Sequence, residues 1–209
     1  MTSARFPLPL RNALAELTIA ALEDAAAAAA LAWLAAPSAA PAEAASARLS
    51  AVHLIDAGHA ALLPVHAQYG DAVAAHARRA LRAADAYRPL RRPAAPRPET
   101  VVRQAAALWN EHLFFEVHEV LEAEWKTARG PVREALQGLI QIAVAFHHRA
   151  HGNIRGARTL MREGRRRLAA APGTLPVVAA EVLLAETAAW DAADGGTAPA
   201  AVPPLRRRA

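Results

Sequence analysis

The stretch of sequence that decides the fold is WNEHLFFEVHEVLEAEW, residues Trp109 to Trp125. At 100° per residue, Phe114, Val117 and Leu121 fall on one line of a helix, while Phe115 lies almost opposite. A helix with apolar residues on two sides must have neighbours on both. The pattern therefore predicts a helix that packs inside a bundle.

Outward from this stretch, glycine and proline mark helix ends. Gly130 can adopt the left-handed conformation that closes a helix, and Pro131 can open the next one. Gly152-Asn153 and Pro172-Gly173 are further breaks. Short connections make successive helices antiparallel, so residues 99–190 are predicted to form an all-α, antiparallel bundle. The helices expected are 99–126, 131–151, 154–171 and 176–189.

The N-terminal region, residues 1–87, is rich in alanine, which has the highest helix propensity, and the whole chain holds 59 alanines. It is predicted to be a helical extension. The segment 88–98, RPLRRPAAPRP, cannot continue a helix and is interpreted as a linker. Residues 191–209 are expected to be a disordered tail. The helices expected in the extension are 11–35, 44–63 and 65–87. Its histidines, interpreted as surface or packing residues, are His53, His59, His66 and His76.

Composition excludes several classes of protein. The chain has no cysteine, which rules out disulfide scaffolds, thiolate metal sites and cysteine nucleophiles. The net charge of +5 is spread over the chain, without the basic domain that is typical of nucleic-acid binding. The apolar run 25–36 is too short to span a bilayer, and Glu16 stands where a signal peptide needs basic residues. We expect no membrane association and a cytoplasmic location.

Polar residues recur where a bundle core should be apolar. His118 and Glu122 share one face of the first helix at i, i+4, and Glu116 and Glu119 share another line. In the second helix, Gln137, Gln141, Val144, His148 and His151 form a mostly polar stripe. If the two sets face each other, they make an internal cluster in which the members pair, because an unpaired buried charge costs several kcal/mol.

The strings FFEVHEVLEAEW, LQGLIQIAVAFHH and GNIRGA, in this order, resemble the bacterial and archaeal family known as domain of unknown function 309, a small all-helical domain. The resemblance covers residues 106–168 and implies a fold, without implying an activity. The motif positions that it places in this chain are Phe115, Glu116, His118, Glu119, Glu122, Trp125, Gln137, Gly138, Gln141, His148, Gly152, Asn153, Gly156 and Ala157.

Three functions other than a structural one are open, two of them on this cluster and one on a separate basic stripe. His118, Glu122 and His148 are candidate metal ligands, since imidazole and carboxylate groups inside bundles bind metals. Paired carboxylates beside an imidazole also permit acid–base chemistry, although no nucleophile is apparent. The third function, nucleic-acid binding, depends on a stripe of arginines in the expected helix 154–171. It is disfavoured because no aromatic residues lie among these arginines. That basic stripe consists of Arg155, Arg158, Arg162, Arg165 and Arg166.

The leading interpretation is a structural or interaction module whose polar cluster fixes helix register or forms an interface in a homo-oligomer. The alternatives are a small-molecule or metal site, with or without catalysis, on the same residues. The sequence does not decide whether the protein is an enzyme and names no cofactor. The candidate site residues are Glu116, His118, Glu119, Glu122, Trp125, Gln137, Gln141, His148 and Asn153.

Overall fold

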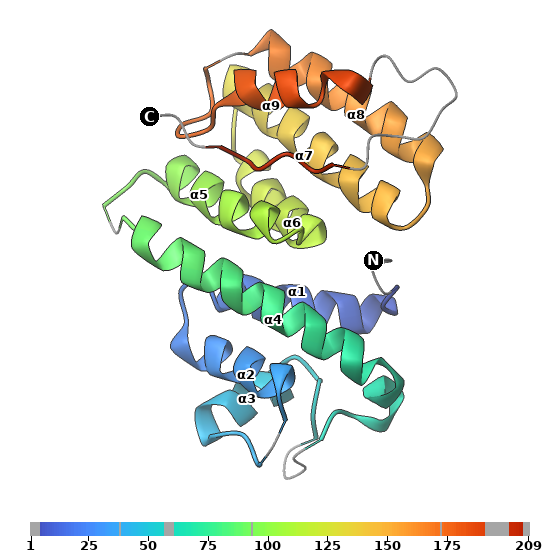
Figure 1. Cartoon of the computed structure of the whole chain (residues 1–209). Coiled ribbons are helices and arrows are strands. Elements are labelled where there is room, and N and C mark those ends of the chain that lie inside the picture. Colours follow the sequence, from blue (N-terminus) through green and yellow to red (C-terminus); the bar gives the residue numbers. More distant parts are fainter. Residues whose placement is uncertain are drawn as a thin grey trace. The chain divides into compact units, whose positions relative to one another are not determined.

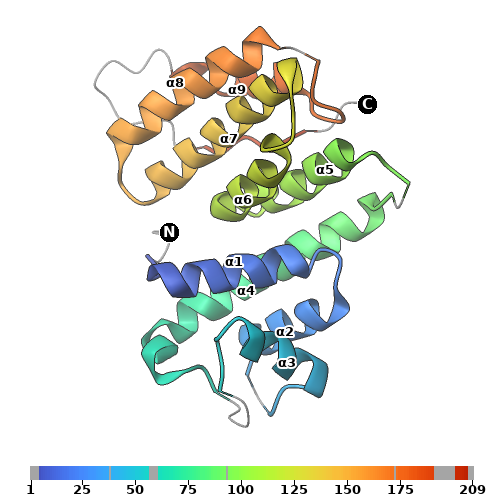
Figure 2. The same ribbon diagram turned by 180° about the vertical axis from the view of Figure 1, so that it is seen from behind.

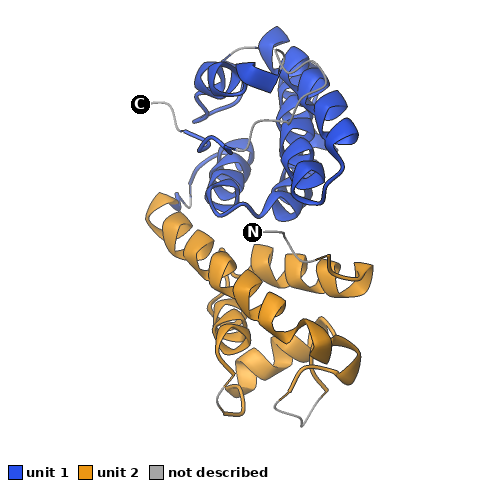
Figure 3. Cartoon of the chain, turned by 45° about the vertical axis from the view of Figure 1, so that its right-hand side comes forward, with its two compact units in different colours: residues 1–3, 91–209 blue, residues 4–90 orange. Residues whose placement is uncertain are grey.

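The computed structural model describes residues 5–37, 39–56, 61–92, 94–171, 173–190 and 201–206 (Figure 1). Within these ranges the chain is all-α, apart from isolated β-bridge residues such as the pair Ile55 and Leu62. The predicted fold class is confirmed. The described residues form two compact units that meet in the chain between Leu90 and Arg91 (Figure 3), and each unit is described separately below.

The N-terminal unit contains more and shorter helices than predicted. The expected helix 11–35 is wrong, because Asp24 interrupts it: its carboxylate accepts a hydrogen bond from the Ala26 N–H at 2.8 Å and caps a second helix. His66 and His76 are buried packing residues, whereas His59 lies outside the described residues. The elements are α1 (Leu8–Ala20), α2 (Ala25–Ala35), α3 (Glu43–Ala51), a 3₁₀ turn (Pro64–Tyr69), α4 (Gly70–Tyr87) and a second 3₁₀ turn (Arg88–Leu90).

Two other predicted helices end early because a histidine takes the left-handed cap position. The expected helix 44–63 stops at Ala51, with His53 at φ 55°, and the expected helix 99–126 is broken after Asn110, with His112 at φ 58°. At the second break the Leu113 N–H donates to the Leu108 carbonyl at 3.0 Å, as in a Schellman motif. Glycine usually occupies this position, so a histidine there is not recognisable as a helix stop.

The C-terminal unit is built on α7, which α6 and α8 both contact (Figures 1 and 2). Gly152, at φ 79°, supplies the predicted turn between α7 and α8, and the Asn153 side chain caps α8 by accepting the Gly156 N–H at 3.0 Å. The elements are α5 (Arg97–Asn110), α6 (Phe114–Trp125), α7 (Gly130–Ala150), α8 (Ile154–Ala170), α9 (Ala180–Glu186) and a 3₁₀ turn (Ala188–Trp190).

Aromatic rings form the centre of this unit. Trp109 of α5 is fully buried and packs edge-on against Phe114 of α6 and Phe146 of α7, with ring centroids 5.5 and 5.6 Å apart. Trp190 also packs edge-on against Phe146, with ring centroids 5.7 Å apart. Edge-to-face contacts at these distances add to the area that the rings bury. This core holds together the helices that carry the candidate site.

Helices α7 and α8 approach unusually closely at a pair of glycines. A Cβ atom on Gly138 would lie 2.8 Å from the Gly164 carbonyl oxygen, and one on Gly164 would lie 2.7 Å from the Gly138 oxygen. Both contacts are with backbone, which cannot rotate away. The close approach therefore depends on Gly138 and Gly164, whereas the sequence analysis assigned no packing role to either.

The predicted disordered tail is wrong for residues 201–206, which are non-helical and hydrogen-bond to α5. The Trp109 indole N–H donates to the Pro203 carbonyl at 2.8 Å, and the Leu205 N–H donates to Asn110 Oδ1 at 2.9 Å. Leu205 is 2% exposed. The rest of the predicted tail, residues 191–200 and 207–209, lies outside the described residues.

Candidate functional site

One turn of α6 brings three potential ligands together. His118, Glu119 and Glu122 each offer one ligand atom, and these atoms lie within 4.8 Å of one another. The i, i+4 spacing places His118 and Glu122 on the same helical face, one turn apart. All three side chains are partly exposed, so a solute can reach them. We call this group the α6 cluster.

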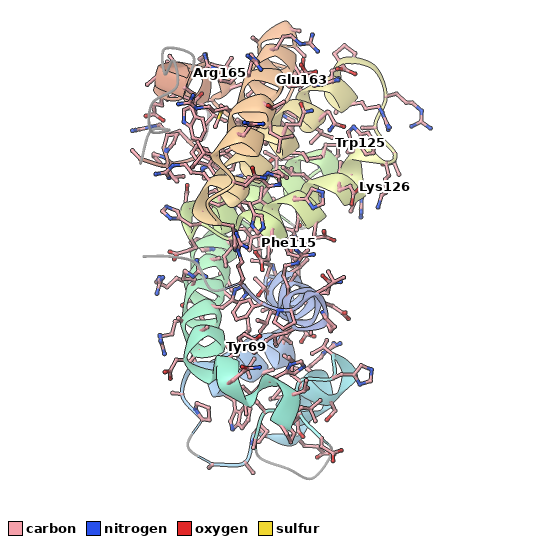
Figure 4. All side chains as sticks on the ribbon, turned by 90° about the vertical axis from the view of Figure 1, so that its right-hand side faces the viewer. Tyr69, Phe115, Trp125, Lys126, Glu163 and Arg165 are labelled. Carbon is pink, nitrogen blue, oxygen red and sulfur yellow. The ribbon has the colours of Figure 1, made fainter. Side chains whose placement is uncertain are left out.

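The imidazole ring of His118 in the α6 cluster is held in a fixed orientation by a neighbouring carboxylate. His118 Nδ1 lies 3.0 Å from Glu119 Oε1, so the carboxylate holds the Nδ1–H form and leaves Nε2 as the acceptor nitrogen. Metal-binding histidines are commonly oriented in this way by a carboxylate. At the other end of the cluster, Lys126 Nζ lies 3.4 Å from Glu122 Oε2 (Figure 4 labels Lys126). This ion pair partly compensates the negative charge of the cluster.

The polar residues of α7 do not form one stripe that faces α6. A Cβ atom on Gly156 of α8 would lie 2.6 Å from His148 Nδ1, and one on Gly164 would lie 3.0 Å from the Gln141 Cβ, so His148 and Gln141 adjoin α8. The histidine that meets α6 is His147, whose ring centroid lies 6.2 Å from that of Phe115. The expected closed cluster is therefore wrong, because the stripe winds across two contact faces.

His148 is poorly prepared to bind a metal. The Asn153 side chain accepts from the Gly156 N–H through Oδ1, which fixes the amide so that its Nδ2 donates to His148 Nδ1 at 3.0 Å. The neutral ring then carries its hydrogen on Nε2, which leaves no free acceptor nitrogen. Asn153 thus works as a helix cap and a partner of His148, and His148 is separated by function from the α6 cluster.

Other predicted site residues serve packing. Glu116 and Glu124 are buried, at 3% and 5% exposure, and Glu124 accepts from Arg97 Nε of α5 at 3.1 Å. Arg133 of α7 lies over the Trp125 ring, 3.8 Å from its centroid, and donates to the Trp125 carbonyl at 2.6 Å. These contacts tie α6 to its neighbours. Gln137 of α7 is half-buried.

The basic stripe of α8 is divided between structure and surface. Arg165 donates to the Leu184 carbonyl at 2.5 Å and to Thr187 Oγ1 at 2.6 Å, and so satisfies the carboxyl end of α9 (Figure 4 labels Arg165 and Glu163). Arg166 hydrogen-bonds Glu163 and, with the charge of Arg167, lowers the pKa of the Glu163 carboxyl to about 2. Arg158 is half-buried, while Arg155 and Arg162 are exposed.

Replacing Arg165 with methionine is expected to destabilise the C-terminal unit by about 1 kcal/mol, because the end of α9 loses charge-assisted hydrogen bonds. Arg162→Met, on the exposed face of the same helix, is the matched control and should change stability by less than about 0.5 kcal/mol. Urea denaturation followed by tryptophan fluorescence measures both. Equal effects of the two substitutions would contradict the role assigned to Arg165.

The sequence analysis missed one histidine pair. His147 and His151 stand at i, i+4 near the carboxyl end of α7, with ring centroids 4.3 Å apart. His151 Nδ1 lies 2.8 Å from the His147 carbonyl oxygen, which orients its ring. The i, i+4 spacing of the pair could be read from the sequence, but it lies beside the stripe that contains His148. Phe115 connects the two groups, with its centroid 6.2 Å from those of both His118 and His147.

No helix in the described ranges combines the length and apolar character needed to cross a bilayer. The C-terminal unit is thus defined by helices that pack on α7 and by a His/Glu face on α6.

Residues 102–160, from within α5 to within α8, match the family described as "Domain of unknown function (DUF309)", which confirms the resemblance seen in the sequence. The match includes the whole α6 cluster. No curated protein and no solved structure matches the chain.

Proposed function

We propose that the C-terminal unit is a binding module whose α6 cluster holds a divalent transition-metal ion. The observation that carries this proposal is the convergence of ligand atoms from His118, Glu119 and Glu122 within 4.8 Å. Imidazole nitrogen and carboxylate oxygen are the common protein ligands of Zn²⁺, Mn²⁺ and Fe²⁺. Partial exposure lets an ion enter and leaves room for solvent or a small ligand beside it.

The three residues have different roles in this proposal. His118 Nε2 and the Glu122 carboxylate are the ligands that share a face of the helix. Glu119, whose Oε1 lies 3.0 Å from His118 Nδ1, orients the imidazole or binds the ion directly. Lys126 must turn away from Glu122 when the ion binds, because both cations compete for the same carboxylate oxygen.

Polar residues outside the α6 cluster support the fold of this module. Glu124, Arg133 and Arg165 bind neighbouring helices through the contacts given above. This division separates residues whose loss should destabilise the unit from residues whose loss should remove only ligand binding.

The test is isothermal titration of the metal-stripped protein with Zn²⁺ and Mn²⁺ at pH 7.5. We expect one ion per chain, and at least tenfold weaker binding in both His118→Gln and Glu122→Gln, because each removes one ligand. His112→Gln is the control: this exposed histidine lies outside the cluster and should leave binding unchanged. Absence of binding, or equal affinity in all variants, would refute the proposal.

Binding should also weaken as the pH falls, because a proton competes with the metal for the imidazole and carboxylate ligands. Repeating the titration at pH 6 therefore gives a second readout. Circular dichroism of each variant establishes that the helices are intact, so a loss of affinity reports on the ligands.

A further inference from the structure

The segment 201–206 lies on the C-terminal unit in the manner of a bound peptide. We propose that the surface beneath it, formed by α5 and the start of α9, is a docking site for extended proline-containing peptides of other proteins, and that the chain's own segment masks it. This proposal is independent of the α6 cluster.

Two side chains of α5 recognise the backbone of the segment. The fully buried Trp109 donates its indole N–H to the Pro203 carbonyl at 2.8 Å, and the Asn110 amide oxygen accepts the Leu205 N–H at 2.9 Å. The partners are 94 and 95 residues apart in the chain. A tryptophan donor aimed at a carbonyl in a proline-containing extended peptide is a recurring means of recognition, because such peptides cost little entropy to bind.

Hydrogen bonds at the other end fix the direction of the segment. The Ala179 N–H, just before α9, donates to the Arg206 carbonyl at 3.0 Å. The Arg206 guanidinium pairs with Glu186 of α9, with Nη2 3.2 Å from Oε1. A peptide bound in this place therefore gains from a basic residue at the position of Arg206.

Burial alternates along the segment. Pro203 and Leu205 are buried, whereas Pro204 and Arg206 between and after them are exposed. This is the period of two expected of an extended chain with one face on a surface. The surface therefore selects proline, then any residue, then leucine, and then a basic residue.

The masking segment acts as a tethered competitor. Because the segment belongs to the same chain, it competes intramolecularly, and a separate peptide of equal intrinsic affinity binds poorly while the segment is in place. Weakening the chain's own segment must then increase the affinity for a peptide added in solution. If the segment were only structural, weakening it would not increase the affinity for an added peptide.

The experiment uses the full chain with Leu205→Glu, which places a charge on the buried position of the segment. The probe is a fluorescein-labelled peptide with the sequence of residues 200–206, Ala-Ala-Val-Pro-Pro-Leu-Arg. Fluorescence anisotropy should show at least tenfold tighter binding to the variant than to the unmodified chain. The same peptide with glutamate in place of leucine is the matched control and should not bind.

Arg206→Glu serves as a second variant, because it sets the segment against Glu186 without introducing a buried charge. Thermal unfolding of both variants is recorded with and without peptide, since a bound peptide raises the transition temperature even of a weakened fold. Failure of the peptide both to bind and to stabilise either variant would overturn the proposal. A dimer of the unmodified chain that Leu205→Glu dissolves would also overturn it, by assigning the surface to a second copy.

Discussion

Gly138→Ala is expected to destabilise the C-terminal unit by about 2 kcal/mol. The added methyl group would lie 2.8 Å from both the Gly164 carbonyl oxygen and the Leu168 nitrogen, so α7 and α8 must move apart. Overpacking of this kind costs about 3 kcal/mol at the upper end of its usual range, and the better helix propensity of alanine returns about 1 kcal/mol.

Urea denaturation followed by tryptophan fluorescence is the measurement, because Trp109, Trp125 and Trp190 all belong to this unit. Gly70→Ala in α4 is the control. Its Cβ would meet no atom within 4 Å, so this change should stabilise its own unit by about 0.4–1 kcal/mol. A Gly138→Ala protein as stable as the unmodified one would mean that the helices do not meet at the two glycines.

Acidification from pH 7 to pH 5 is expected to destabilise the N-terminal unit through His76. The ring is buried between α4 and α1, where its Nε2 lies 3.1 Å from Thr18 Oγ1, and Phe6 packs edge-on at 6.0 Å. Burial, followed by the charge of Arg79, lowers the His76 pKa from 6.5 to about 3. The imidazole therefore stays neutral in the folded protein.

The direction of the effect follows from proton binding. Between pH 6.5 and about pH 3, His76 is protonated in the unfolded chain but neutral in the folded protein. The unfolded state therefore binds more protons, and the free energy of unfolding decreases as the pH falls from 6.5 to about 3. One pH unit corresponds to about 1.4 kcal/mol for one proton, which gives a loss of about 2 kcal/mol at pH 5 and about 3 kcal/mol at pH 4.

Urea melts followed by far-ultraviolet circular dichroism at pH 7 and pH 5 test this expectation. His76→Gln is the comparison, because glutamine keeps a hydrogen-bonding group near Thr18 and cannot titrate. The difference between the two proteins in their pH dependence isolates His76 from other ionisable groups. Equal pH dependence in both would show that His76 is protonated in the folded state.

The helical class could be predicted because alanine and apolar periodicity extend over most of the chain. Breaks marked by glycine or proline, such as Gly152, were located correctly. Breaks at His53 and His112 were missed, because these residues take a left-handed conformation that sequence alone does not suggest. The order in residues 201–206 was missed for a different reason: its partners, Trp109 and Asn110, are distant in the sequence.

The sequence predicted which residues belong to the candidate site better than it predicted how they are arranged in space. The i, i+4 relation of His118 and Glu122 depends on helix geometry alone and could be read directly. Which way the α7 residues point depends on where α6 and α8 lie around that helix. His148 is one residue, and thus 100°, away from His147, and this difference sends the two rings to different neighbours.

The docking of Leu205 on Asn110 links groups that are 95 residues apart, and this has a consequence for biosynthesis. A ribosome that adds 5–20 residues per second needs roughly 5–20 s to travel between the two positions. During that interval the Trp109 indole must do without its carbonyl acceptor. The nascent chain therefore passes through a stage in which α5, the first helix of the unit to be synthesised, lacks segment 201–206. During this stage α5 is exposed to chaperones and to aggregation.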